Sequence, residues 1–200
     1  MSLRHCGLGL ALLLLAGCAG LPEAPPDSVA VQSAWALRQQ QLGSVQGFEV
    51  NGRVAVKGGG LSGALRWEQD GEAFKLRIAG PFGAGALSIQ GTPALVAIKG
   101  KDIDLVTDAP QQVLAKRTGW RLPLDALRWW VLGLPAPAVE ASITLDAEGR
   151  AVQMQQGDWQ LRYSDYRSDA ESAPALPGRI EAVQGEWTAT VVVEAIHLKP

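Results

Sequence analysis

The sequence predicts an α+β fold in which helices cover one mouth of a curved antiparallel sheet. About eleven short segments alternate apolar and polar residues with a period of two, which is typical of half-buried strands. They follow one another at intervals of about 8 to 12 residues with turn residues between them, which indicates a meander that curls towards a barrel. Helical sequences stand before the first strand and in the middle of the chain.

Residues 1–17 are expected to be a signal peptide that is removed. A short basic start precedes an apolar stretch that is too short for a permanent membrane-spanning helix. The stretch ends in Leu15-Ala16-Gly17-Cys18, which resembles the lipobox of bacterial lipoproteins, where the cysteine thiol accepts a diacylglycerol. Cys18 is therefore the predicted lipidation site. The alternative is an ordinary secretory signal that happens to contain a cysteine.

A lipid on Cys18 would hold the mature chain on a membrane, because a diacylglycerol and an N-acyl chain exceed the two signals that stable anchoring needs. Residues 18–28 are rich in proline and small residues and are expected to be a tether to a single domain at residues 29–200. Ala19 beside the anchor favours the outer membrane, so we expect a lipid-anchored protein that faces the periplasm. Cys6 lies in the removed segment, so no disulfide is expected.

Composition argues against nucleic-acid binding and catalysis. Removal of residues 1–17 takes only Arg4 from the 18 basic residues, which leaves 17 against 20 acidic ones, a formal net charge of −3 and no basic stripe. His197 is the single histidine of the mature chain, so neither a histidine-based metal cluster nor a cysteine–histidine pair is expected. We therefore expect no enzyme, no cofactor and no metal.

Three other features have simple interpretations. The glycines at 58–60 stand between alternating segments and predict a hairpin turn rather than a phosphate cradle. Asp102, Asp104 and Asp108 alternate with apolar residues and lack the other residues of a calcium loop, so they predict a solvated strand face. The seven tryptophans all lie in the mature chain, where they would either fill a core or line a site for an apolar ligand.

The first element is an amphipathic helix over residues 29–42, with Ser28 or Asp27 as its cap and Gly43 at its end. Val31, Trp35 and Leu42 fall near helical spacing on it. From there the period is two. Six strands are expected at residues 48–57, 61–68, 74–78, 87–89, 95–98 and 103–105.

Two helices are expected next, at residues 110–118 and 123–132. The second has Pro123 in its first turn and Gly133 after its end, as helix termini favour. Its apolar face carries Leu124, Leu127, Trp130 and Val131. Strands resume at residues 143–145, 152–154, 159–163, 180–183 and 188–198.

Several segments resemble the LolB family of outer-membrane lipoprotein receptors. The most specific is the run W-V-L-G-L-P at residues 130–135. The segments that carry the resemblance are 52–56, 65–67, 80–83, 119–123, 127–137, 157–163 and 176–177. Members are similar in fold to the periplasmic carrier LolA. The resemblance therefore implies an unclosed β-barrel with a helical lid over an apolar cavity that holds acyl chains.

The resemblance also implies a function and its partners. The protein would accept client lipoproteins, through their acyl chains, from a LolA-type periplasmic carrier and insert them into the outer membrane without nucleotide or metal, and we expect a monomer. Each buried methylene is worth roughly 0.8 kcal/mol, so acyl chains need protection from water during the transfer. A wide pocket that binds them less favourably than a bilayer does would still release them.

Phe82 lies between Pro81 and Gly83 in a tight turn, where an apolar side chain usually contacts a partner or a membrane. The family motif places a protruding hydrophobic residue here that aids delivery into the bilayer; Leu is commoner. The alternative is a ring folded back onto the barrel. The apolar positions that we expect to line the acyl-chain cavity are Val54, Leu65, Trp67, Leu76, Ile78, Leu87, Ile89, Leu127 and Trp130.

Two other functions fit these residues. The same barrel would suit another lipid, such as a glycolipid or lipopolysaccharide. A purely structural envelope lipoprotein would instead have a filled core, and no apolar dye would bind to it.

Overall fold

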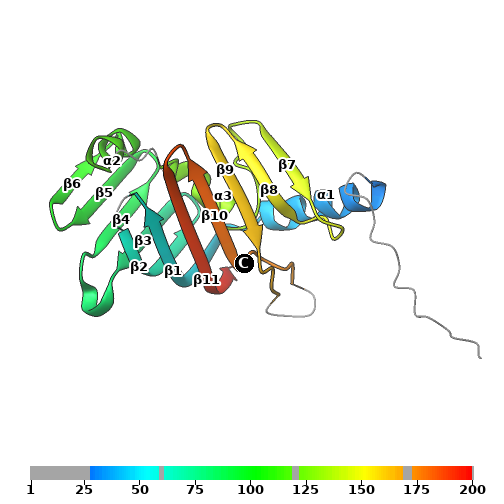
Figure 1. The fold of residues 1–200 in the computed structure, drawn as a ribbon, viewed down its shortest axis with the longest axis horizontal. Helices are drawn as coiled ribbons and strands as arrows, with labels where there is room; N and C mark the ends of the chain where they lie inside the picture. Colours follow the sequence, from blue (N-terminus) through cyan, green and yellow to red (C-terminus); the bar gives the residue numbers. More distant parts are fainter. Residues whose placement is uncertain (1–27, 59–60, 119–121, 169–172, 200) are drawn as a thin grey trace, which may run out of the picture.

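The computed structural model describes residues 28–58, 61–118, 122–168 and 173–199. In this part of the chain, three α-helices accompany one antiparallel sheet (Figure 1). The helices are α1 (Val29–Gly43), α2 (Pro110–Thr118) and α3 (Leu124–Trp130), and the strands are β1 (Gly47–Lys57), β2 (Leu61–Asp70), β3 (Ala73–Ala79), β4 (Leu87–Thr92), β5 (Leu95–Gly100), β6 (Ile103–Thr107), β7 (Ala141–Leu145), β8 (Ala151–Gln156), β9 (Trp159–Ser164), β10 (Arg179–Gln184) and β11 (Trp187–Lys199).

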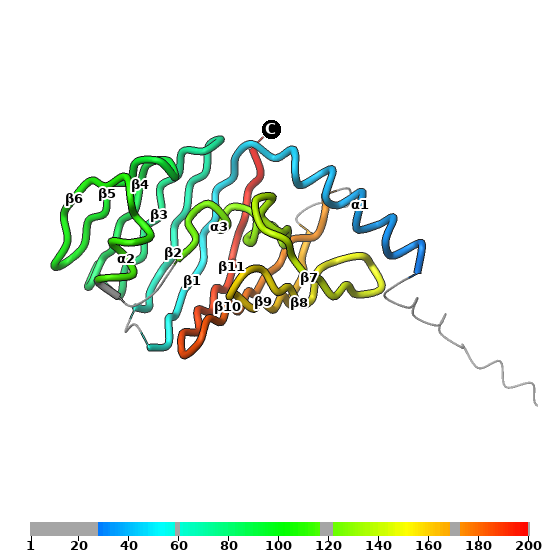
Figure 2. Tube along the Cα trace, turned by 90° about the horizontal axis from the view of Figure 1, so that it is seen from above, coloured from blue at the N-terminus to red at the C-terminus, as the bar shows by residue number. Residues whose placement is uncertain are grey.

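The sheet consists of two meanders that meet in its middle. Strands β1 to β6 form one and β7 to β11 the other, and β1 pairs with β11 between them. Among the described residues, β6 and β7 each have a neighbour on one side only, so the barrel is not closed. The expected unclosed antiparallel fold with added helices is therefore confirmed. Figure 2 shows the curvature, with α3 inside the curve of the sheet.

The junction between β1 and β11 depends on Gly52. The register of this pair shifts between Asn51 and Gly52, where the carbonyl of Val192 occupies the place that a Cβ of residue 52 would need. A side chain at this position would therefore push the two central strands apart. The C-terminal strand β11 lies at the centre of the sheet.

Helix α1 packs against the β7–β8 end of the sheet, as Figure 1 shows. Ser28 caps it, because its side chain accepts a hydrogen bond from the backbone N–H of Val31 (3.3 Å). The turn between β7 and β8 approaches the helix at Gly149, whose φ is +70° and where a Cβ would stand 2.7 Å from the Cβ of Ala34. Val31, Trp35 and Leu42 are buried, so the expected helix packs through the residues that the sequence named, but Leu37 is exposed and Arg38 is buried.

Helix α3 is shorter than the expected 123–132. Pro123 stands at its N-cap, and a tight turn follows in which the N–H groups of Gly133 and Leu134 donate to the carbonyls of Trp130 and Trp129. Gly133 adopts a φ of +74°, a left-handed conformation that ends the helix. No helix in the described part of the chain is long and apolar enough to cross a membrane.

Candidate functional site

The concave side of the sheet encloses an apolar cavity of about 140 Å³. Strands of both meanders form its wall, and α2 and α3 contribute to it from the other side. All nine side chains that the sequence singled out stand on this wall: Val54, Leu65, Trp67, Leu76, Ile78, Leu87, Ile89, Leu127 and Trp130. Alternation along the strands places seven of them there, because every second residue faces the same side of a sheet. Leu127 and Trp130 reach the wall from α3.

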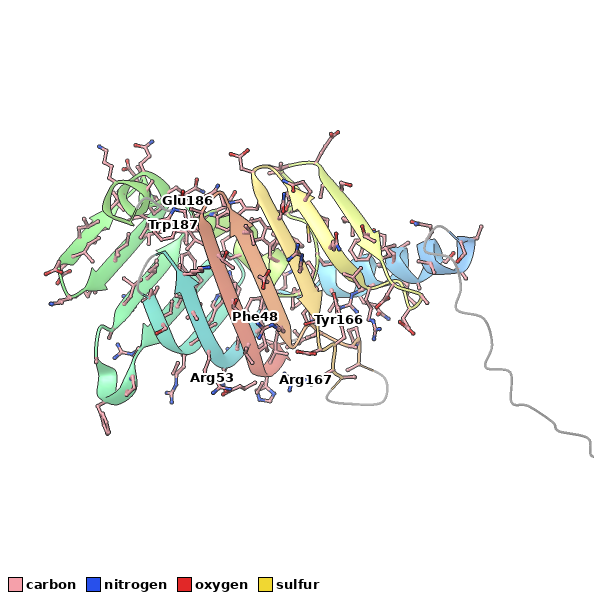
Figure 3. The ribbon with its side chains drawn as sticks, in the orientation of Figure 1. Phe48, Arg53, Tyr166, Arg167, Glu186 and Trp187 are labelled. Carbon is pink, nitrogen blue, oxygen red and sulfur yellow. The ribbon has the colours of Figure 1, made fainter. Side chains whose placement is uncertain are left out.

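The sequence predicts nine of the 21 residues that line the cavity. The second meander contributes seven residues, among them Trp187 at the start of β11, which Figure 3 labels. The same alternation in the C-terminal strands was the signal for them. The further lining residues are Val56, Leu61, Leu114, Leu122, Val131, Trp159, Leu161, Ile180, Ala182, Trp187, Ala189 and Val191.

The indole N–H groups of Trp67 and Trp130 have hydrogen-bond partners. The indole N–H of Trp67 donates to Oε1 of Gln69 (3.0 Å), and Gln69 in turn donates to the carbonyl of Gly71 (2.9 Å). Phe48 packs edge-on against the Trp67 ring at 5.0 Å. Because these polar groups are satisfied, the cavity offers a ligand little beside dispersion contacts.

Gln156 of β8 fastens the C-terminal end of α3. This side chain is 3% exposed, and its Oε1 accepts from the indole N–H of Trp130 (2.8 Å) and from the backbone N–H of Ala136 (3.0 Å). Its Nε2 donates to the carbonyls of Ala136 (2.8 Å) and Val139 (2.6 Å). One buried amide thus fixes both the helix and the chain that leaves it.

Arg128 fastens α3 to the opposite meander. Its guanidinium donates to the carbonyls of Gly71 (3.0 Å) and Val45 (3.4 Å), and it lies 4.9 Å from the centre of the Trp129 ring. Helix α2 packs on β4 and β5 through Leu114, in an apolar cluster with Ile89, Val96 and Ile98. The cover of the cavity therefore has an element fixed by polar bonds, α3, and an element that packs mainly through apolar contacts, α2.

The turn between β3 and β4 projects Phe82 away from the protein. Three backbone bonds close this turn: Gly80 N–H to Ala84 (2.9 Å), Gly83 N–H to Gly80 (3.0 Å) and Ala84 N–H to Pro81 (3.1 Å). Phe82 has a φ of +55°, and its side chain is fully exposed to solvent. Its ring is not folded back onto the barrel.

A buried cluster lies apart from the cavity, under α1. Arg38 and Arg150 lie on the Tyr166 ring at 5.2 and 5.0 Å from its centre, and the hydroxyl of Tyr166 donates to the carbonyl of Ala151 (2.7 Å). Burial raises the pKa of Tyr163 and of Tyr166 and lowers that of Arg38. These contacts attach α1 to the sheet.

The predicted lipidation site, the glycine turn at 58–60 and the aspartates near β6 lie outside the cavity wall or outside the described residues. Cys18, residues 1–27 and the glycines at 59–60 lie outside the described residues. Gly58, with a φ of +93°, follows the end of β1. Asp104 pairs with Lys99 (3.8 Å), and no three His, Cys, Asp or Glu side chains of the described residues gather as metal ligands.

Comparisons with known proteins agree with one another. The family model described as "Outer membrane lipoprotein LolB" matches residues 46–195. Outer-membrane lipoprotein LolB of Nitrosococcus oceani is 37% identical over 185 residues, which cover 89% of this chain and 90% of the relative. The protein of the same name from Pseudomonas savastanoi pv. phaseolicola is 34% identical over 202 residues, covering 97% and 96%.

Solved structures support the fold alone. A LolA superfamily protein from Nitrosomonas europaea superimposes with a TM-score of 0.50 at 10% identity, over 86% of this chain and 95% of that one. A DUF1329 family protein from Desulfovibrio piger gives a TM-score of 0.52 at 8% identity, over 86% and 94%. The sequence matches extend over most of both chains, and the chain belongs to the LolB family of outer membrane lipoproteins.

Proposed function

We propose that this chain is an outer-membrane receptor that accepts lipoproteins from a LolA-type periplasmic carrier and inserts them into the outer membrane. The observation that carries the proposal is the apolar cavity between the curved sheet and α2 and α3. Its wall offers acyl chains apolar contact without a specific polar partner, so that binding protects them from water. Such a wall also lets the chains leave for a bilayer.

The size of the cavity implies that loading moves part of the cover. A cavity of about 150 Å³ in another protein accommodates benzene, whereas an acyl chain of a lipoprotein is more than twice as long as that ring. The cavity of about 140 Å³ would therefore enlarge when a client enters. Because polar bonds fasten α3 on two sides, we expect α2 to move away from β4 and β5.

The proposed anchor and the exposed ring act on the same membrane. A lipid on Cys18 and the tether at residues 18–28 would hold the domain on the periplasmic side of the outer membrane. Phe82 would then enter the bilayer while the client passes from the cavity, since an exposed aromatic ring at a loop tip is suited to that environment. In this proposal the protein needs no catalytic group and acts as a monomer.

The test is a transfer assay with purified components. A LolA-type carrier loaded with a fluorescent lipoprotein is mixed with the chain from residue 19 onward, which contains every described element. We expect the client to leave the carrier and appear on the receptor. A client that stays on the carrier would overturn the proposal.

Phe82→Glu separates acceptance from insertion. A carboxylate at this exposed tip leaves the cavity intact, so acceptance from the carrier should be unchanged while insertion into liposomes falls. Equal loss of both steps would point to damage to the fold. Phe82→Leu, which keeps an apolar side chain, is the matched control and should keep both steps.

A receptor for a different lipid would use the same cavity. Mass spectrometry of the lipids that copurify with the chain distinguishes the two, because a glycolipid or lipopolysaccharide at unit stoichiometry would favour that alternative. A structural lipoprotein with a filled core is disfavoured by the cavity itself.

A further inference from the structure

The outer face of β1 to β3 carries an arrangement of charges that the cavity does not explain. In the register of β2 and β3, Ala64 faces Ala79 next to the Phe82 turn, and Arg66 faces Arg77 two residues further along. Glu68 and Lys75 face each other beyond that pair. The arginines are exposed and alternate with cavity residues such as Trp67, so both point outward.

Arg66 and Arg77 oppose each other directly, and like charges in that relation destabilise a sheet. In the described part of the chain, no ion pair includes either guanidinium. By contrast, Arg53 on the neighbouring strand pairs with Glu194 at 2.9 Å. Two adjacent guanidinium groups without a carboxylate partner suit a phosphate, which arginine binds in a bidentate manner.

A shallow groove lies between the Phe82 turn and the arginine pair: it ends at Ala64 and Ala79, the facing pair next to Arg66 and Arg77 on the same side of the sheet. It has a volume of about 510 Å³, and Gly80 and Pro81 of the turn line it together with Arg53 and the small residues of β2, β3 and β11. The turn therefore adjoins the outer face. Figure 3 shows Arg53 on the lower side of the sheet, where Figure 1 shows the β3–β4 turn. When Phe82 enters a bilayer, the same face comes next to the headgroups.

We propose that Arg66 and Arg77 bind the phosphate of an anionic phospholipid of the outer membrane, beside the groove that Pro81 lines. The lipid would lie with its headgroup on the arginines and the start of its chains in the groove of small residues. This binding would orient the domain on the membrane before release of the client. The inference rests on the proposed delivery of lipoproteins to that membrane. To the apolar contact of Phe82 with the bilayer it adds a polar contact with the headgroups that depends on their charge.

The test compares two double variants of equal charge. Arg66→Gln with Arg77→Gln removes the proposed site, and Arg162→Gln with Arg179→Gln removes two outer-face arginines of β9 and β10. Each chain, from residue 19 onward, is mixed with vesicles of phosphatidylcholine and with vesicles in which a quarter of the lipid is phosphatidylglycerol. Cosedimentation measures binding at low and at physiological salt.

We expect the parent chain to prefer the anionic vesicles and the Arg66/Arg77 variant to lose about tenfold to thirtyfold of that affinity. The Arg162/Arg179 variant should stay within twofold of the parent. Equal loss in both variants would mean that net charge alone acts, and no loss in either would mean that the arginines do not bind lipid; both outcomes overturn the inference.

Client uptake from the carrier in solution, without vesicles, keeps the two proposals apart. The Arg66/Arg77 variant should accept clients as the parent does, because neither arginine lines the cavity. If the parent fails in uptake, the receptor proposal is wrong. If uptake succeeds but the anionic preference is absent, only the phospholipid site is wrong. Unfolding by urea should show the double variant to be at least as stable as the parent, since the like-charge pair is removed.

Discussion

At the scale of single residues, Phe82 combines full exposure with an unfavourable backbone conformation. Its φ of +55° and ψ of 22° lie in the left-handed region, which a bulky side chain rarely adopts. Such conformations persist when the surrounding structure imposes them, and they concentrate at functional sites. The three backbone bonds of the turn impose it here. The ring is thus held outward at a cost to the stability of the fold.

Phe82→Asn should make the fold more stable while it reduces insertion of clients into liposomes. Asparagine tolerates the left-handed region, so the free energy of unfolding should rise by up to about 1 kcal/mol. Urea denaturation measures it, with Phe82→Leu as the control that keeps the conformational cost. A lower stability for the asparagine variant would show that the ring contributes contacts that its exposure does not indicate.

The two buried tyrosines predict a loss of stability in alkaline solution. Burial raises the pKa of Tyr163 and Tyr166, so the folded chain keeps both protons after the unfolded chain has lost them near pH 10. Stability is therefore fully present below that pH and falls above it, by up to about 1.4 kcal/mol per pH unit for each tyrosine. Urea unfolding at several pH values measures the slope.

Replacement of each tyrosine by phenylalanine shows how much of the alkaline loss of stability that tyrosine causes. Each should make the alkaline decline shallower, but they should differ at pH 7. The Tyr163 hydroxyl has no hydrogen-bond partner among the described residues, so Tyr163→Phe should keep or raise stability. Tyr166→Phe loses the bond to Ala151 and should lower it by about 1 kcal/mol. An unchanged alkaline slope in both variants would refute the assignment.

At the scale of elements, Gln156 is the side chain on which the position of α3 depends most. Gln156→Ala would leave the indole N–H of Trp130 and the backbone of Ala136 without partners in a buried place. We expect the free energy of unfolding to fall by about 2 to 4 kcal/mol, because unsatisfied buried polar groups are costly. The exposed neighbour Gln155→Ala should change it by less than about 0.5 kcal/mol. Similar effects of both substitutions would contradict this role.

The sequence predicts the positions of the strands and helices better than it predicts which strands pair and which side chains bond to one another. Alternation places the strands within a few residues, and it places Val54 and Leu65 on the concave face, because the period of a strand is local. The pairing of β1 with β11 is not local, since it depends on a bulge at Gly52 between segments far apart in the chain. The bonds of Gln156 are hidden for the same reason: its position suggests a turn, and only the fold brings Trp130 to it.

At the scale of the whole molecule, the open sheet separates two tasks. Its concave side is apolar and shielded by α2 and α3, whereas its outer side carries Phe82 and the paired arginines of β2 and β3. A sheet that is not closed can change its curvature when the cover moves, because β6 and β7, as described, each pair with a strand on one side only. The fold therefore allows a ligand in the cavity and a membrane at the outer face at the same time.

Occupation of the cavity should stabilise the whole domain. A ligand that binds only the folded chain adds about 2.7 kcal/mol when its free concentration is a hundredfold above its Kd. For a domain of this size, palmitate under those conditions should raise the Tm by about 5 to 10 °C. Differential scanning calorimetry measures the shift. Ala189→Phe should abolish it, because Ala189 lines the cavity and a ring there would fill it. Ala36→Phe, on the exposed side of α1, should keep it. A full shift in the Ala189 variant would mean that palmitate binds elsewhere, and the cavity would then lose its role in holding acyl chains.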